Sequence, residues 1–183
     1  MANVHPPSAG EVYYLSTGVG HWRGSFRFRI TSWRLLRRTP IGLKQLILAV
    51  GMHAVQRLTG AATIDSVIVA GDGDADQPIA SNAVRIRRFR VTLYSLDETY
   101  AVGTDGRSVT VNARERFGPI PFLFRNAKRH GAVIGDDGQS SRYDMPLLGT
   151  PWVAEYKVSE DRCEIRGRLY SAWGEAAEVM GKQ

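Results

Sequence analysis

A set of polar side chains alternates with small and apolar ones between residues 163 and 171. The set consists of Glu164, Arg166, Arg168 and Tyr170. Successive side chains of a strand point to opposite faces, so these four share one face. That face either lines a wet cavity or meets solvent, and both remain open. In the first case Arg166 and Tyr170 are candidate ligand-binding residues.

Two residues elsewhere could move a proton. His53 lies beside the apolar stripe of a helical stretch, where it could act as a proton donor or acceptor at a cavity mouth. The alternative is a partly buried histidine that makes one hydrogen bond. Tyr143 is a second candidate of the same kind. No hydrolase serine motif, phosphate loop, paired cysteines or close histidine–carboxylate pair is present, so we expect no metal site and no cofactor.

The stretch from Gly20 to Thr31 predicts a strand with one buried face. Trp22, Phe26 and Phe28 fall on one side of it, and arginines fall on the other. The buried side supplies Phe26 and Phe28 as candidate walls of a cavity. Trp152 and Tyr156, which share a face of a later predicted strand, are candidate walls as well.

Two helices are predicted over about 33–59. Thr39 is expected to cap the second helix with Pro40 at its first position, and Gly60 is expected just past its end. The apolar stripe of this helix is wide and includes Met52. We therefore expect cover on more than one side, either by a ligand near Met52 or by a second copy of the chain.

Short strands separated by turns follow from residue 62 onward. With the first strand they give about eight to ten strands, which indicates a sandwich or a barrel. The tail at 172–183 could be a helical turn or a last strand that closes the barrel.

The opening Gly20-His21-Trp22 resembles the first-strand motif of the calycin barrels, which include lipocalins and fatty-acid-binding proteins. The helical insertion resembles the lid of the latter. The resemblance implies a single antiparallel barrel with a lid between the first two strands, and a basic residue packed on Trp22, for which we choose Arg168. It also matches Arg168-Leu169-Tyr170 to a carboxylate-holding pair. The haem-binding branch needs a late histidine, but none follows His130.

The length and composition of the chain suit one domain. The chain has 183 residues, of which 43% are hydrophobic, and a net charge of +6. We expect a flexible lead at 1–11 and one lipocalin-like domain at 12–183. There is one cysteine, and we find neither a signal peptide nor an apolar run of membrane-spanning length, so we expect a cytoplasmic protein.

Arginines cluster at 34–38 and at 85–90, interleaved with aromatic residues. A nucleic-acid surface would combine such a cluster with exposed aromatic rings. Phe26, Phe28 and Phe89 are expected to be buried, so a solvated strand face is favoured and nucleic acid is not.

The sequence thus predicts a mainly β protein that binds a small, largely apolar molecule inside a barrel. The first alternative is an enzyme that isomerises or cyclises a hydrophobic substrate in the same cavity, with His53 or Tyr143 as acid or base. The second is a basic nucleic-acid-binding barrel. A homodimer through the apolar lid helix is also left open.

Overall fold

The computed structural model describes residues 18–71, 80–102, 108–118, 125–135, 137 and 139–183. The predicted lead at 1–11 lies outside these residues. The described elements are β1 (Gly20–Ile30), α2 (Trp33–Arg38), α3 (Leu43–Thr59), β2 (Ala62–Ala70), β3 (Ala80–Arg88), β4 (Val91–Val102), β5 (Ser108–Phe117), β6 (Arg125–Ile134), β7 (Ser140–Leu147), β8 (Thr150–Val158), β9 (Glu164–Tyr170) and β10 (Gly174–Lys182).

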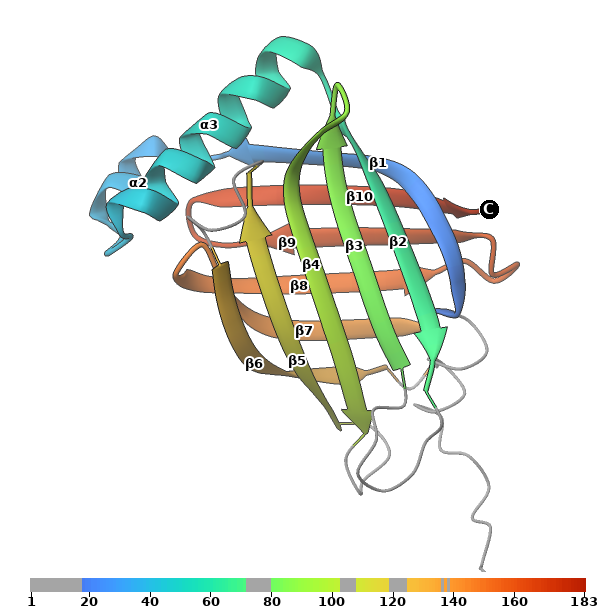
Figure 1. The fold of residues 1–183 in the computed structure, drawn as a ribbon. Helices are drawn as coiled ribbons and strands as arrows, with labels where there is room; N and C mark the ends of the chain where they lie inside the picture. The colour runs from blue at the N-terminus through green and yellow to red at the C-terminus, as the bar shows by residue number, and fades with distance from the viewer. Residues whose placement is uncertain (1–17, 72–79, 103–107, 119–124, 136, 138) are drawn as a thin grey trace, which may run out of the picture.

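The ten described strands form one closed barrel. Each strand pairs antiparallel with its neighbour in the chain, and β1 pairs with β10 to complete the ring. Strands β2 to β5 cross over β7 to β10, and both helices lie at one end (Figure 1). The predicted antiparallel barrel with helices between its first two strands is therefore confirmed.

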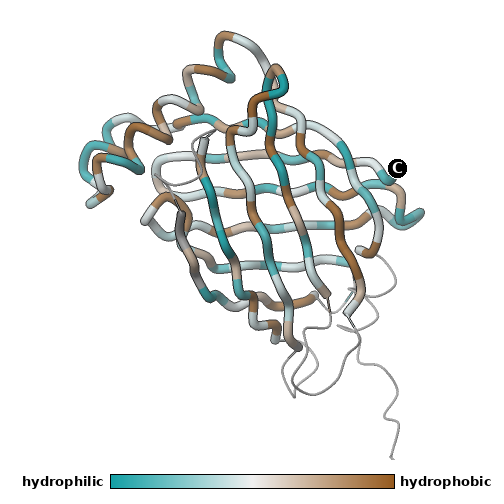
Figure 2. The backbone as a smooth tube through the Cα atoms, in the orientation of Figure 1, coloured by the Kyte–Doolittle hydropathy of each residue, from teal (hydrophilic) through white to brown (hydrophobic). Residues whose placement is uncertain are grey.

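Alternation of side chains decides what lies inside. Along β1 the apolar residues are buried and the arginines are exposed, as the sequence predicts. Brown and teal segments alternate along most strands of the barrel (Figure 2). Gly24 interrupts the row of large side chains because a Cβ there would collide with the carbonyl oxygen of Val179 on β10. The close approach of β1 to β10 therefore requires a glycine.

Trp22 anchors the junction where the barrel closes. Its side chain is fully buried, and its Nε1 donates a hydrogen bond to the Gly18 carbonyl at 2.8 Å. The cation beside it is Lys182, whose Nζ lies 5.5 Å from the ring centroid. Lys182 is the direct partner of Trp22 across β1 and β10. Arg168, the predicted partner, lies on the outer face of β9 over the ring of Tyr170.

The tail that the sequence left ambiguous is β10. It lies between β1 and β9, so it is the strand that closes the barrel. Its outer residue Glu175 pairs with Arg29 of β1 at 2.5 Å. Its inner residues Ala176, Glu178 and Met180 are buried.

The helix boundaries differ from the prediction at one point. Helix α3 begins at Leu43 after Gly42, and Thr39 instead ends α2, where its hydroxyl donates to the Leu35 carbonyl. Residues 40–42 are not helical, so Pro40 does not start a helix. Gly60 does end α3, with a φ of 84° and its N–H bonded to the Gln56 carbonyl.

Helix α3 covers the barrel with one side only. Ala49 and Gln56 are buried, whereas Leu43, Ile47 and Leu58 are 72%, 59% and 85% exposed. Within the described part of the chain, nothing covers this second side. Neither helix described here is long and apolar enough to span a membrane.

Candidate functional site

The barrel interior contains a cavity of about 120 Å³. Most of its wall is apolar, with Ile64, Val84, Leu96 and Leu169 among the lining residues. An apolar cavity of about 150 Å³ in a protein core can take up benzene, so this volume suits a ligand of similar size. Its place inside the barrel and its apolar wall make the cavity the main candidate site.

Five of the predicted site residues line this cavity. Phe26 and Phe28 reach it from β1, Met52 from α3, Tyr143 from β7 and Tyr156 from β8. Met52 is placed at the cavity because α3 crosses the end of the barrel. The predicted alternation in β1 and β8 turns Phe26, Phe28 and Tyr156 toward the barrel interior.

Trp152 is buried but does not line the cavity. Its ring packs against Phe28 and Trp173 with centroid distances of 6.1 and 5.1 Å. Its Nε1 donates to the Thr150 hydroxyl at 3.0 Å. Trp152 therefore supports the wall of the cavity from behind Phe28.

The structure places Arg166 and Tyr170 on the outer face of the barrel. Ile165, Gly167 and Leu169 occupy the inward positions of β9, so the alternating polar set points outward. Arg166 pairs with Glu164 at 2.5 Å, and the Tyr170 hydroxyl donates to Glu155. Neither residue contributes to the cavity, and Arg168 shares this face.

His53 faces a different hollow, between α3, β1 and β10. Its Nδ1 accepts a hydrogen bond from the Ile30 backbone N–H at 3.2 Å, and its ring meets the edge of Trp33. His53 and the cavity-lining Tyr143 are therefore not brought together. The proposed catalytic role of His53 stays a prediction without a connection to the cavity.

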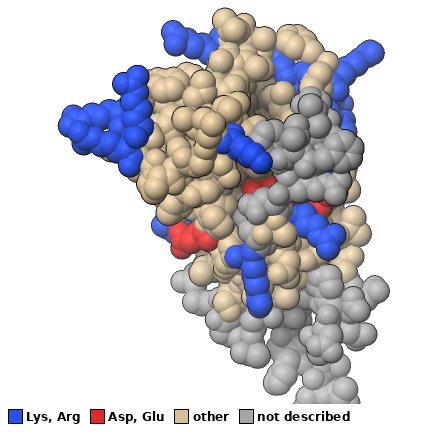
Figure 3. Space-filling view, turned by 60° about the vertical axis from the view of Figure 1, so that its left-hand side comes forward, with Lys and Arg blue, Asp and Glu red and all other residues tan. Residues whose placement is uncertain are grey.

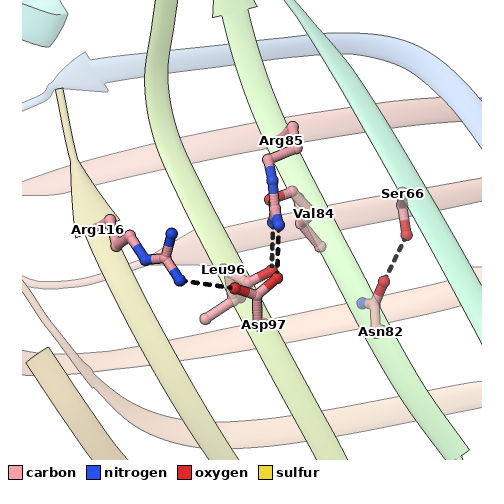
Figure 4. A network of polar contacts seen from close by, with 7 residues as sticks. All are labelled: Ser66, Asn82, Val84, Arg85, Leu96, Asp97 and Arg116. Carbon is pink, nitrogen blue, oxygen red and sulfur yellow. Dashed lines mark hydrogen bonds and ion pairs between the residues drawn. The ribbon is translucent and has the colours of Figure 1, made fainter. Parts of the chain in front are cut away.

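Sequence reasoning missed a polar network on the cavity wall formed by β2, β3 and β4. The Ser66 hydroxyl donates to the Asn82 side-chain oxygen at 2.8 Å, and the Asn82 amide donates to Glu98 at 3.3 Å. Figure 4 shows the first of these bonds. The Tyr100 hydroxyl donates to Glu98 at 2.7 Å. All four residues line the cavity, so a buried carboxylate is fixed on this wall.

A second polar group lies on the wall formed by β7 to β10. The strand register places Ser141, Tyr156, Gly167 and Glu178 side by side on successive strands. A Cβ on Gly167 would come within 2.5 Å of the Tyr156 ring and 3.3 Å of a Glu178 carboxylate oxygen. The glycine thus leaves room for the hydrogen bond between Tyr156 and Glu178. We call the polar residues of these two walls the polar pole. They are Ser66, Asn82, Glu98, Tyr100, Ser141, Tyr156 and Glu178.

The two walls interact electrostatically across the cavity. Burial raises the pKa of Glu178 to about 7, with the negative charge of Glu98 adding to the increase and the Tyr156 hydrogen bond opposing it. Burial, Glu178 and Glu98 also raise the pKa of Tyr156 well above 10. Tyr156 is therefore a neutral hydrogen-bond donor, and Glu178 changes its charge near neutral pH.

A further buried carboxylate, Glu115, lies in the inward-facing row of β5 but is not among the described lining residues. Tyr94, which lines the cavity, donates to it at 2.8 Å. Burial and the nearby charge of Glu115 raise the pKa of the Tyr94 hydroxyl. This pair adds hydrogen bonding to the core but does not place Glu115 in contact with a ligand.

The outer arginines make contacts on the barrel surface. Arg85 and Arg116 converge on Asp97 at 2.7 and 3.6 Å (Figure 4). Arg88 donates to the Thr59 hydroxyl and the Ala61 carbonyl. Phe89, which was expected to be buried, is 73% exposed because it occupies the turn between β3 and β4 with a φ of 48°.

The sequence matches no protein-family model and no curated protein. The closed antiparallel barrel with a helical insertion after its first strand is compatible with a calycin-like barrel.

Proposed function

We propose that this protein binds a small, largely apolar molecule inside the barrel. The observation that carries the proposal is an apolar cavity inside the barrel with a polar pole on two of its walls. Apolar walls supply binding free energy, and a few placed polar groups orient a ligand. Membership of the calycin superfamily is part of this proposal, supported by the Gly20-His21-Trp22 motif and the arrangement of the strands.

Benzyl alcohol is a suitable first probe because it is neutral and matches the cavity in size. We expect a saturable shift of amide resonances from cavity-lining residues in an NMR titration. Met52→Lys should weaken binding by about tenfold or more, because the substitution places a charge at an apolar wall. Leu58→Lys is the matched control, since Leu58 lies on the exposed side of the same helix. If wild-type protein shows no saturable shifts, the proposal is wrong.

An enzyme acting in the same cavity is the second candidate. Tyr143 and Glu178 both line the cavity, and a carboxyl group with a pKa near neutral is suited to general acid–base catalysis. Native mass spectrometry of freshly purified protein would detect a retained molecule. Conversion of that molecule by added protein would favour an isomerase or cyclase, and its recovery unchanged would favour a binding protein.

We include a homodimer and a cytoplasmic location in the proposal. The exposed apolar residues of α3 support association through the lid. The free and exposed thiol of Cys163 supports a reducing compartment.

A further inference from the structure

The charge of the cavity wall narrows the class of ligand, provided that the proposed function is right. Glu178 is 7% exposed and lies in the wall. Among the described residues its hydrogen-bond partner is the Tyr156 hydroxyl, and the charge acting on it is the negative charge of Glu98. No lysine, arginine or histidine is among the described lining residues. A positive charge inside this cavity would therefore stabilise Glu178 in its ionised form.

Ser141 provides an independent indication that the polar pole receives a ligand. Its side chain is 4% exposed and lines the cavity. Within the described residues its hydroxyl has no hydrogen-bond partner. A buried hydroxyl without a partner is unfavourable, so a polar atom of a ligand, or a water that accompanies it, would satisfy this group.

The charge of the cavity wall is negative, which is the reverse of what a carboxylate ligand requires. The Arg168 and Tyr170 pair, which the calycin resemblance connects with a carboxylate, lies on the outer face. A carboxylate inside the cavity would instead face Glu98 and Glu178, and like charges in a poorly solvated site repel strongly. An ammonium group brings up to three hydrogen-bond donors and the opposite charge.

We propose that the ligand is a small hydrophobic amine whose ammonium group binds at the polar pole beside Glu178, with its apolar body among the aromatic and aliphatic wall residues. The carboxylate of Glu178 and the charge of Glu98 attract the ammonium group. The Tyr156 hydroxyl, held at Glu178 over Gly167, orients that carboxylate. Ser141 lies further along the same row and contacts the ligand or its water.

This arrangement makes amine binding depend on pH. Among the described residues, the titratable groups that act on Glu178 are Tyr156 on β8 and Glu98 on β4. Tyr143 on β7 acts on Tyr156, and the ring of the buried His130 on β6 lies 6.0 Å from that of Tyr143. Burial, aided by Glu98, raises the pKa of Glu178 to about 7, and the ammonium group needs this carboxyl ionised. The affinity for an amine should therefore rise several-fold between pH 6 and pH 8, whereas the affinity for a neutral molecule should not.

Benzylamine, benzyl alcohol and benzoate test the inference because they share one ring and differ in charge. At pH 7.5 we expect benzylamine to bind at least about tenfold more tightly than benzyl alcohol, and benzoate to bind most weakly. Glu178→Gln should reduce the ratio of benzylamine affinity to benzyl alcohol affinity to about twofold or less, whatever its effect on each affinity alone. Glu175→Gln is the control, because Glu175 lies on the outer face of the same strand.

The outcomes separate the inference from the proposed function. If benzyl alcohol binds but benzylamine binds no more tightly, the amine inference is wrong and the binding function stands. If none of the three compounds binds, both are wrong. Should Glu178→Gln fail to fold, the pH series on wild-type protein decides, since an equal pH response for amine and alcohol overturns the inference.

Discussion

Single residues in this barrel take their chemical behaviour from the wall around them. Glu175 and Glu178 are three positions apart on β10, yet one pairs with Arg29 at the surface and the other is buried beside Tyr156. Alternation along the strand produces the difference, because odd positions face solvent and even positions face the cavity. The same amino acid therefore serves as a surface ion-pair partner and as part of a candidate binding site.

The raised pKa of Glu178 predicts a change of stability with pH. Burial, and then Glu98, raise the pKa from 4.5 to about 7, so folding favours the protonated form. The stability from this group is fully present below about pH 4.5 and is lost as pH rises through 7, a difference of about 3 kcal/mol. Glu178→Gln should thus gain stability relative to wild type between pH 4.5 and 8. Urea unfolding at several pH values measures this.

Glu175→Gln serves as the control for that series, because Glu175 lies on the outer face of the same strand. A Glu178→Gln variant whose stability relative to wild type is the same at pH 4.5 and pH 8 would show that Glu178 ionises normally in the fold.

At the level of elements, sequence periodicity was sufficient for β1 but not for β10. In β1 the alternation of large apolar residues with arginines leaves one choice of buried face. In β10 the inward row is Ala176, Glu178 and Met180, and the glutamate breaks the apolar pattern. The strand becomes evident only when it pairs with β1 and β9, which are separated from each other by most of the chain. Sequence reasoning missed the polar pole for the same reason, because its residues come together only through the pairing of the strands.

The direction in which β9 faces also depends on pairing. The polar and apolar sets of β9 have similar numbers of residues, so the sequence alone does not decide which set faces the interior. The structure turns Ile165 and Leu169 inward, next to Ala154 and Val158 of β8 and Ala176 and Met180 of β10. Burying the apolar set of β9 with the apolar sets of both neighbours removes more apolar surface from water than the opposite choice.

The exposed apolar and basic residues of the lid predict how it would associate with a second copy of the chain. Ile47 is 59% exposed on a lid that also carries basic residues at 34, 37, 38, 44 and 57, and the sequence contains no Asp or Glu between residues 12 and 64. This side of the molecule shows basic groups around a broad uncharged surface (Figure 3). Two such lids would bury apolar side chains but repel each other electrostatically.

We therefore expect a dimer through α3 to be favoured by salt. Light scattering at 50 mM and 500 mM salt, which correspond to long and short screening lengths, should show a larger mass at the higher salt concentration. Ile47→Lys should abolish the increase, and Val133→Lys, at a similarly exposed apolar position on β6, should not. Association that weakens with added salt, or that survives Ile47→Lys, would exclude the lid as the interface.

The chain has a net charge of +6, and among the described residues the exposed arginines lie mainly on outer strand faces and on the lid, while the cavity wall carries carboxylates. The outer arginines are partly neutralised by neighbouring acids. Asp97 pairs with Arg85 and Arg116, and Asp65 pairs with Arg23 and Arg87. The aromatic rings of β1 point inward, and Phe89 at its turn is the exposed ring beside this cluster, with the Arg88 guanidinium 4.5 Å from its centroid.

This arrangement predicts weak binding to nucleic acid. Phosphate contacts would have to displace the ion pairs of Arg85 and Arg87 and the hydrogen bonds of Arg88. Among the described residues, few exposed rings are available for base stacking. We expect a Kd of about 10 µM or weaker for a random single-stranded oligonucleotide at physiological salt, within the usual non-specific range. Replacement of Arg85, Arg87, Arg88 and Arg90 by glutamine should change it little. Fluorescence anisotropy over a salt series measures both, and a sub-micromolar Kd that is lost in this variant would instead support a nucleic-acid-binding barrel.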